Sequence, residues 1–262
     1  MSVELKSAGQ DAEAAERAAR EGGSDKRAYV QKAFSEIAPR YDLLNHLLSL
    51  NIDKRWRREA IRALAWQEDA DGVYLDLCTG TLDVAEELAK APGFKGRVVG
   101  ADFAEPMLRA GAFKVRALPV LPAAADALQL PLAGGSVAGA IVAFGIRNVA
   151  DLDAGLREVH RVLRPGGRFV ILEFTTPRSL VVRAVYHAYF HHVLPLIGEM
   201  VSGHGSAYRY LPKSVANFPA PNALVARMRG AGFSEVRWTP LTMGIAAIHV
   251  GIKGVGSTGR SA

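Results

Sequence analysis

The sequence contains one cysteine and no long uninterrupted apolar run. Cys78 is the single cysteine among 262 residues, which excludes an intramolecular disulfide and a cysteine-rich metal site, so no metal centre is expected. The most apolar stretch, residues 180–201, is interrupted by Arg183, Pro195, Glu199 and three histidines. A helix that spans a bilayer needs roughly 20 predominantly apolar residues. We therefore expect no transmembrane helix and a cytosolic protein.

Large apolar side chains are almost absent from the N-terminal region. Residues 1–27 combine glycines with many alanines and charged residues, and they lack the apolar centre of a secretory signal. The end of the chain is similarly polar. The sequence therefore predicts a disordered tail over residues 1–27, one domain over 28–253, and a flexible tail over 254–262.

The charge is basic, with a formal net charge of +6. The densest basic cluster, residues 54–58, reads Lys-Arg-Trp-Arg-Arg, and Arg62 follows one helical turn later. This pattern favours a solvated helix face, and contact with acidic lipid head groups or RNA is the alternative. No zinc-finger, RNP or KH signature accompanies it, so we expect no nucleic-acid partner.

Two segments have the pattern of a nucleotide-binding α/β unit. The apolar run at residues 73–77 predicts a strand that ends in a turn through Gly80, and a helical pattern begins at Asp83. A second strand ends at Asp102, where a carboxylate can accept hydrogen bonds from a ribose diol. The pair indicates a cofactor that contains adenosine, and an ordinary strand–helix turn is the alternative.

The turn also lacks the motifs of phosphate-binding cofactors. Neither G-x-G-x-x-G nor G-x-x-x-x-G-K-[ST] is present, and Leu82 follows the single glycine of the turn, Gly80. An acid on the strand, Asp76, suits an amino group, and the turn amides suit a carboxylate. S-adenosylmethionine has both groups and no phosphate, so it is the cofactor that these residues predict.

From residue 73, strand and helix patterns alternate, which predicts a mostly parallel sheet with helices on both faces. Ligands of such sheets bind at the carboxyl ends of the strands. Asp126, residues 144–148 and residues 173–175 are expected at this edge together with Asp76, Gly80 and Asp102. This convergence predicts one active site.

Residues 178–214 interrupt the alternation with aromatic and aliphatic side chains in helical spacing. Because they follow the fifth predicted strand, we expect them to cover the ligand edge of the sheet as an apolar lid. Such a lid suits a lipophilic substrate, and plain core packing is the alternative.

These motifs together resemble the ubiquinone/menaquinone biosynthesis C-methyltransferases over about residues 30–253. The matching segments are Tyr-Asp-Leu-Leu-Asn at 41–45, Phe-Gly-Ile-Arg-Asn-Val at 144–149, Arg-Val-Leu-Arg-Pro-Gly-Gly at 161–167, Leu-Glu-Phe at 172–174, His-Val-Leu-Pro at 192–195 and Tyr-Arg-Tyr-Leu at 208–211. The resemblance implies a class I S-adenosylmethionine methyltransferase, Rossmann-like, with a mostly parallel sheet, N-terminal helices and an apolar lid insert.

The resemblance also implies roles for individual residues. Gly80 and Thr81 would hold the methionine part of the cofactor, Asp102 the ribose hydroxyls, and Asp126 with Ala127 the adenine edge. The sequence departs from the family pattern at two positions. Leu82 stands where the family commonly has glycine or alanine, and Ala143 stands where a small polar residue is frequent.

Methylation of a ring carbon requires an electron-rich quinol, so a proton has to leave a hydroxyl group. Arg147 and Asn148 are the candidates that order a water and stabilise the quinolate, and Tyr41 is a further candidate. An ion pair with a surface acid is the alternative for Arg147, and core packing for Tyr41. His192 and His249 are further candidate bases, although structural roles are more common for such histidines.

The predicted function is C-methylation of a polyprenylated quinol, with demethylmenaquinol as the expected substrate. The benzoquinol step of ubiquinone biosynthesis and methylation of another lipophilic phenol are alternatives within the enzyme class. A basic RNA-binding protein on a degenerate methyltransferase fold is the alternative outside it. Peripheral contact with the inner face of a membrane and a homodimer are further expectations.

Overall fold

The fold was obtained as a computed structural model. It describes residues 23–38, 49, 51–177, 179–180, 183–184 and 206–255. Tyr41, His192 and most of the predicted lid segment lie outside these residues, so their expected roles stay predictions.

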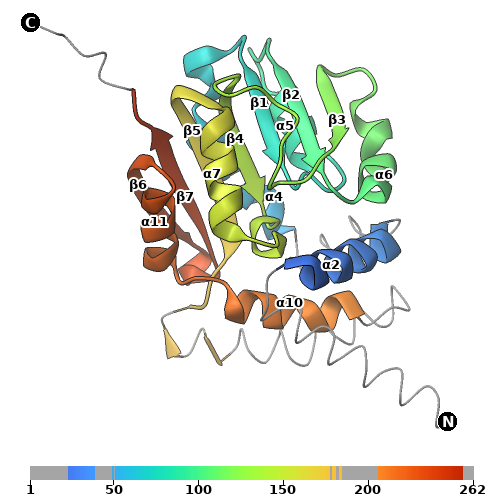
Figure 1. The fold of residues 1–262 in the computed structure, drawn as a ribbon, viewed down its shortest axis with the longest axis vertical. Coiled ribbons are helices and arrows are strands. Elements are labelled where there is room, and N and C mark those ends of the chain that lie inside the picture. The colour runs from blue at the N-terminus through green and yellow to red at the C-terminus, as the bar shows by residue number, and fades with distance from the viewer. Residues whose placement is uncertain are drawn as a thin grey trace, which may run out of the picture.

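Seven strands and seven α-helices form the described part of the chain (Figure 1). The strands are β1 (Val73–Leu77), β2 (Arg97–Asp102), β3 (Val120–Ala124), β4 (Val137–Ala143), β5 (Leu163–Phe174), β6 (Phe233–Leu241) and β7 (Ala246–Lys253). The helices are α2 (Gly23–Ile37), α4 (Ile52–Leu64), α5 (Asp83–Ala89), α6 (Glu105–Val115), α7 (Leu152–Val162), α10 (Ser206–Asn217) and α11 (Pro221–Gly230). Three 3₁₀ turns are η2 (Trp66–Asp69), η3 (Ile146–Asn148) and η5 (Thr242–Gly244).

All seven strands pair in one sheet of order β3-β2-β1-β4-β5-β7-β6. The pairs among β1 to β5 are parallel, and β7 pairs antiparallel with both β5 and β6. The mostly parallel sheet predicted from the sequence is therefore confirmed. Strand order reverses between β1 and β4, and ligands of such sheets bind beside this reversal, at the carboxyl ends of the strands.

Side chains alternate between two apolar layers along each central strand, because successive side chains of a strand point to opposite faces. On β1, Leu75 and Leu77 pack against the layer that contains α7 and α11, whereas Tyr74 packs against the layer of α4, α5 and α6. On β4, Ala140 and Val142 belong to the first layer. Both faces of the sheet are therefore buried, as a parallel sheet requires.

Local sequence signals account for the helix boundaries at the ligand edge. Asp151 caps α7 by accepting a hydrogen bond from the amide of Ala154 at 3.0 Å, and Pro106 lies in the first turn of α6. Residues 164–167 contain a proline and paired glycines, which usually end an element, yet they lie in the first part of β5. Helix α7 ends earlier, at Val162.

Helices α2 and α10 lie side by side across one edge of the sheet (Figure 1). Tyr29 of α2 and Tyr210 of α10 pack with ring centroids 5.6 Å apart, and Val30 is buried beside them. Helix α2 begins at Gly23, so residues 23–27, the last part of the segment expected to be a tail, belong to this helix. None of the described helices has the length and apolar character needed to cross a membrane.

Candidate active site

The turn between β1 and α5 has an unusual backbone. Cys78, Gly80 and Leu82 all adopt positive φ angles, of 52°, 56° and 68°. Residues other than glycine rarely adopt this backbone conformation, so surrounding contacts have to hold the turn in place. The carboxylates of Asp76 on β1 and Asp102 on β2 provide these contacts.

Asp76 lies on β1 below the turn and is buried. Its Oδ2 accepts hydrogen bonds from the Thr79 hydroxyl and from the amide of Ala85 at 3.0 Å. Burial raises its pKa to about 7, although these hydrogen bonds and the charge of Arg57 oppose the shift. Asp76 was predicted to bind the amino group of the cofactor, but its carboxylate fixes the turn and does not line the pocket described below.

Asp102, at the end of β2, lies on the other side of the turn. Its Oδ2 accepts from the amide of Gly80 at 2.9 Å, and its Oδ1 accepts from the amide of Ala104 at 2.8 Å. Burial raises the pKa of Asp102 above its ordinary value, because desolvation outweighs the two hydrogen bonds. Each oxygen keeps a further lone pair, so the carboxylate can still accept from a ligand.

The side chain of Leu82 points away from this site. It is fully buried in the apolar layer of α4, α5 and α6. Gly100 on β2 makes room for it, since a Cβ at that position would collide with a methyl group of Leu82. The departure from the family pattern at Leu82 is thus matched by the small residue on the neighbouring strand.

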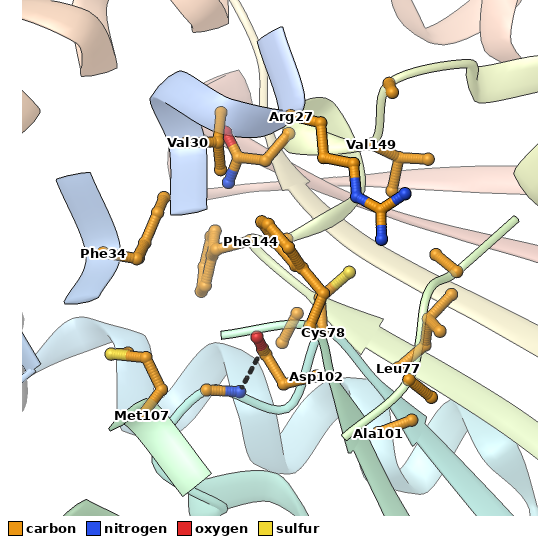
Figure 2. A pocket seen from close by; sticks show the side chains of 18 residues that line it. Arg27, Val30, Phe34, Leu77, Cys78, Ala101, Asp102, Met107, Phe144 and Val149 are labelled. Carbon is orange, nitrogen blue, oxygen red and sulfur yellow. Dashed lines mark hydrogen bonds between the residues drawn. The ribbon is translucent and has the colours of Figure 1, made fainter. Parts of the chain in front are cut away.

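A pocket opens beside Gly80 and Asp102. Figure 2 shows Phe144 and Cys78 projecting into its middle, with Met107 on one side and Leu77 on the other. Most of its lining is apolar or glycine, and its polar groups come from Asp102, Asn148, Arg27 and the backbone. Its lining residues are Arg27, Val30, Phe34, Leu77, Cys78, Gly80, Ala101, Asp102, Phe103, Met107, Ala125, Ala127, Ala143, Phe144, Gly145, Asn148, Val149 and Ala150.

Helix α2 forms one wall of the pocket. Arg27 reaches from α2 toward the pocket (Figure 2), and its Nη1 lies 2.8 Å from Oδ2 of Asp126. The other oxygen of Asp126 accepts from the amide of Leu128 at 2.9 Å. Asp126 itself does not line the pocket, whereas its neighbour Ala127 does. An adenine amino group would therefore meet an Asp126 that Arg27 already neutralises.

The segment after β4 brings two predicted catalytic residues to this edge on η3. Asn148 lines the pocket, and its Oδ1 is buried without a partner among the described residues. Gly145 just before η3 contacts the turn so closely that a Cβ there would overlap the Cβ of Cys78. Cys78 is largely buried and burial raises its thiol pKa, so it packs as a neutral side chain.

Arg147 does not line this pocket. Its Nη1 donates to Oε1 of Glu173 at 2.7 Å and to the carbonyl of Phe144, and its Nε donates to Oγ of Ser214 at 3.3 Å. The guanidinium also lies 5.7 Å from the centre of the Phe174 ring. Arg147 thus forms an ion pair, as the alternative for this residue expected, but its partner is the buried Glu173 and not a surface acid.

The pocket fits a ligand with a diol and without phosphates. Asp102 is the one carboxylate among its lining residues and Arg27 the one cation, so a pyrophosphate would find little compensation for its charge. The amide of Gly80 donates to Asp102, so it is not arranged as a phosphate cradle. Apolar walls and an acid at the end of β2 suit an adenosine held through its ribose.

Residues 22–253 match the model of the ubiE/COQ5 methyltransferase family. The chain belongs to this family. It is 53% identical over 221 residues to a demethylmenaquinone methyltransferase of Thermus thermophilus, covering 83% of this chain and 98% of that protein. It is 44% identical over 234 residues to a ubiquinone/menaquinone biosynthesis C-methyltransferase of Geotalea uraniireducens, covering 88% and 98%.

Solved structures agree on the fold of this ubiE/COQ5 member. A SAM-dependent methyltransferase of Thermotoga maritima superposes with a TM-score of 0.58 at 19% sequence identity, over 85% of this chain and 98% of that one. The Rossmann-like methyltransferase fold expected from the sequence is therefore confirmed. At this identity the likeness extends to the fold alone.

Among the residues that family resemblance assigned to the cofactor, Gly80, Asp102 and Ala127 line the pocket. Thr81 is buried outside it, and its carbonyl lies against α6 at Gly111. His249 lies away from this edge, because it pairs with Ile171 in the middle of strands β5 and β7. Burial lowers its pKa to about 4, and its Nε2 contacts the carbonyl of Pro221, as expected of a structural histidine.

Sequence reasoning missed the contribution of α2. Arg27, Val30 and Phe34 line the pocket, at spacings of three and four residues that place them on one helix face. Only Val30 and Phe34 among these three residues are apolar and mark the helix face in the sequence, and Arg27 was assigned to the tail. The spacing could have revealed the helix, but not which part of the sheet it covers.

Proposed function

We propose that this protein transfers the methyl group of S-adenosylmethionine to a ring carbon of a reduced, polyprenylated quinone. The observation that carries the proposal is the pocket at Asp102, which fits a diol ligand without phosphates and adjoins Asn148 on η3. Family membership supports the reaction class. The proposed substrate is demethylmenaquinol, because the demethylmenaquinone methyltransferase of Thermus thermophilus shares 53% identity with this chain.

When bound, S-adenosylmethionine supplies an electrophilic methyl group on a sulfonium centre. Asp102 would accept hydrogen bonds from its ribose hydroxyls, and the apolar walls at Leu77 and Met107 would contact its adenosine. The ion pair with Asp126 would hold Arg27 next to the adenine edge. Helix α2 would then exclude water from the donor, which favours an in-line displacement in a dry site.

The polar residues next to this pocket support chemistry on a phenolic oxygen. The guanidinium of Arg147 would stabilise the negative charge of a quinolate electrostatically. The unpartnered Oδ1 of Asn148 would accept from the substrate or from an ordered water. Tyr41 stays a candidate for the same edge, outside the described residues.

Labelled methyl transfer tests this function. The protein would be incubated with trideuteromethyl-S-adenosylmethionine and either chemically reduced demethylmenaquinone or the matching benzoquinol. Mass spectrometry of the re-oxidised product should find the label on a ring carbon, with faster turnover for the naphthoquinol. Faster benzoquinol turnover would move the assignment to ubiquinone biosynthesis, and label on oxygen or on neither quinol would contradict the proposal.

A quinol with a prenyl tail is reached from a membrane, so we also propose peripheral contact with its inner face. The basic side of α4 supports this, since Lys54, Arg55 and Arg58 are exposed there. Trp56 of α4 donates to the hydroxyl of Thr242 at 2.9 Å, and the neighbouring Met243 on η5 is 72% exposed. Basic and apolar groups together are typical of peripheral membrane surfaces.

A further inference from the structure

Glu173 is the second-to-last residue of β5, at the edge where the parallel strands of the sheet end. It is only 1% exposed. Its Oε1 accepts from Nη1 of Arg147 at 2.7 Å and from the amide of Phe174 at 2.9 Å. Its Oε2 has no hydrogen-bond partner in the described part of the chain. A buried carboxylate oxygen without a donor is costly, so it marks a position at which a donor binds.

Two further buried polar atoms have no hydrogen-bond partner among the described residues, and both lie on neighbouring elements. They are Oδ1 of Asn148, next to Arg147 on η3, and the hydroxyl of Tyr210 on α10. Tyr210 interacts electrostatically with both Arg147 and Glu173, so the three side chains share one neighbourhood. Ser214, one turn further along α10, holds the other side of Arg147. Protein interiors rarely leave such groups unsatisfied without a ligand or water.

The chemistry of these atoms defines the ligand group. The oxygens of Glu173 and Asn148 accept hydrogen bonds, whereas Arg147 offers positive charge and Tyr210 a hydroxyl that donates or accepts. A phenolic hydroxyl complements this set, since it donates one proton and becomes an oxyanion when that proton leaves. Glu173 is the one carboxylate in this group of side chains.

We propose that Oε2 of Glu173 accepts the hydroxyl proton of the quinol, with Arg147 holding the carboxylate in place and stabilising the quinolate oxygen. This inference rests on the proposed function. As the O–H bond breaks, its electron pair moves into the ring, and the adjacent ring carbon forms the bond to the methyl group. The carbon–sulfur bond breaks, and its electrons stay on sulfur. The ring hydrogen then leaves as a proton to solvent, and Glu173 returns its proton to the oxygen.

The surroundings of Glu173 tune it for this role. Burial raises the pKa of Glu173 above its ordinary value of 4.5, with the charge of Arg147 and hydrogen bonds to Phe174 and Arg147 acting in the opposite direction. Tyr210 faces it from α10, and burial raises the pKa of this phenol to about 12, so it stays neutral. On α2, burial lowers the pKa of Lys26, and the nearby positive charge of Arg147 lowers it further. A base of raised pKa removes a phenolic proton more readily.

The test compares Glu173→Gln with the wild type and with Glu68→Gln, a control at an exposed position on η2. Loss of a general base should lower kcat by a factor of about 10²–10⁴ in Glu173→Gln, while KM for the quinol and Kd for S-adenosylmethionine stay nearly unchanged. The wild-type rate should rise with pH through the pKa of Glu173, and this acidic limb should vanish in the variant. Glu173→Asp should recover part of the rate. Unchanged kcat and pH profile in Glu173→Gln would overturn the proposal.

Substrate acidity separates proton transfer from a structural defect. Ring-halogenated quinols ionise more easily, so the rate deficit of Glu173→Gln should shrink as the hydroxyl becomes more acidic. A defect in packing or in the position of Arg147 would lower the rate equally for all of these quinols. An equal deficit across the series would therefore contradict the role of Glu173 as the base.

An equilibrium measurement decides the point without turnover. The ligand is an unreactive hydroxynaphthalene that is ionised at the assay pH. Its complex with the wild type should take up one proton from solution, because the carboxylate of Glu173 and the bound oxyanion share that proton. Calorimetry in buffers of different ionisation enthalpy measures this uptake, which should be absent in Glu173→Gln. Should that variant fail to fold, binding to the wild type without proton uptake would still overturn the proposal. Absence of methyl transfer in the wild type would count against the proposed function alone.

Discussion

At the scale of single residues, the cofactor turn depends on glycines that let other backbone segments approach. Gly111 in α6 lies so close to Thr81 that an added Cβ would overlap the carbonyl oxygen and the neighbouring backbone of the turn. Gly145 approaches Cys78 in a similar way from the other side. The turn is thus held between two backbone segments, and its conformation sets the position of Gly80 and the pocket.

Substitution of Gly111 by alanine should reverse the usual effect of this change in a helix. Alanine normally stabilises a helix relative to glycine, but overlap with Thr81 should lower the free energy of unfolding by about 1–3 kcal/mol. Affinity for S-adenosylmethionine should fall as well. Gly230→Ala in α11 is the control, because its added Cβ would meet no other described residue within 4 Å beyond its chain neighbours and the backbone of its own helix. Urea unfolding of both variants checks this, and equal stability of the two would contradict it.

Asp76 should make stability depend on pH. Its pKa is raised from 3.8 to about 7 in the folded protein, so between these values the folded state holds a proton that the unfolded state has lost. The contribution of this residue to stability therefore falls as pH rises through that window and is constant above it. The free energy of unfolding of the wild type relative to Asp76→Asn should decrease across the window. A constant difference would show that Asp76 is ionised throughout.

The sequence predicted which residues reach the ligand edge better than it predicted their partners. Asp102 and Asn148 follow strand ends, and strand ends can be recognised from apolar runs. The partner of Arg147 could not be inferred, because Glu173 lies 26 positions away and its orientation depends on the pairing of β4 with β5. The partners of Asp76 depend on the path of the turn, and the sequence indicates its positive φ angles only at Gly80.

At the scale of elements, a buried ionic network joins the three helices behind the cofactor turn. Arg57 on α4 contacts Asp83 at the start of α5 at 2.7 Å and Asp53 at 3.2 Å. Lys114 on α6 contacts the other oxygen of Asp83 at 2.6 Å. The network thus fixes the start of α5 directly after the turn. Removal of one charge leaves its buried partners with less compensation, which is strongly destabilising.

Arg57→Met and Arg55→Met make a matched pair on α4. The side chain of Arg57 is 9% exposed, whereas that of Arg55 is 79% exposed and pairs with Glu59 on the same helix. The first substitution should cost about 3–5 kcal/mol of unfolding free energy, and the second less than about 1 kcal/mol. Chemical denaturation measures both. Similar losses in the two variants would mean that the network contributes little beyond a surface ion pair.

Secondary structure was largely predictable from the sequence from residue 73 onward. The apolar run at residues 73–77 marked β1, the strand ending at Asp102 is β2, and the helical pattern from Asp83 is α5. The extension of β5 back to Leu163 was not predicted, because a proline and paired glycines usually end an element. The start of α2 at Gly23 was also missed, since its apolar side chains begin only after a polar first turn.

At the scale of the whole molecule, basic and apolar groups on α4 and η5 give the proposed membrane contact a location. Binding to anionic liposomes should be measurable by co-sedimentation at low ionic strength and should weaken with added salt. Met243→Asp should reduce it, because it places a charge among groups that would enter the lipid surface. Leu121→Asp on β3 is the control, at a side chain that is 63% exposed. Equal binding by both variants would contradict this location.

The mostly parallel sheet with helices on both faces follows from the alternation of strand and helix patterns in the sequence, whereas the order of the strands was not predicted. The sequence could not predict that α2 would line the pocket, because this helix reaches it through contacts between distant parts of the chain. A homodimer stays a prediction, which sedimentation velocity of the full chain would test.

The central claim is that the pocket at the ends of β1 and β2 holds S-adenosylmethionine through Asp102. Calorimetric titration of the wild type and of Asp102→Ala with this cofactor tests it most directly, with thermal unfolding as a check that the variant folds. We predict micromolar affinity for the wild type and a loss of about 30-fold or more in the variant, equivalent to ~2 kcal/mol. Equal affinity in both, or no binding by the wild type, would contradict the account.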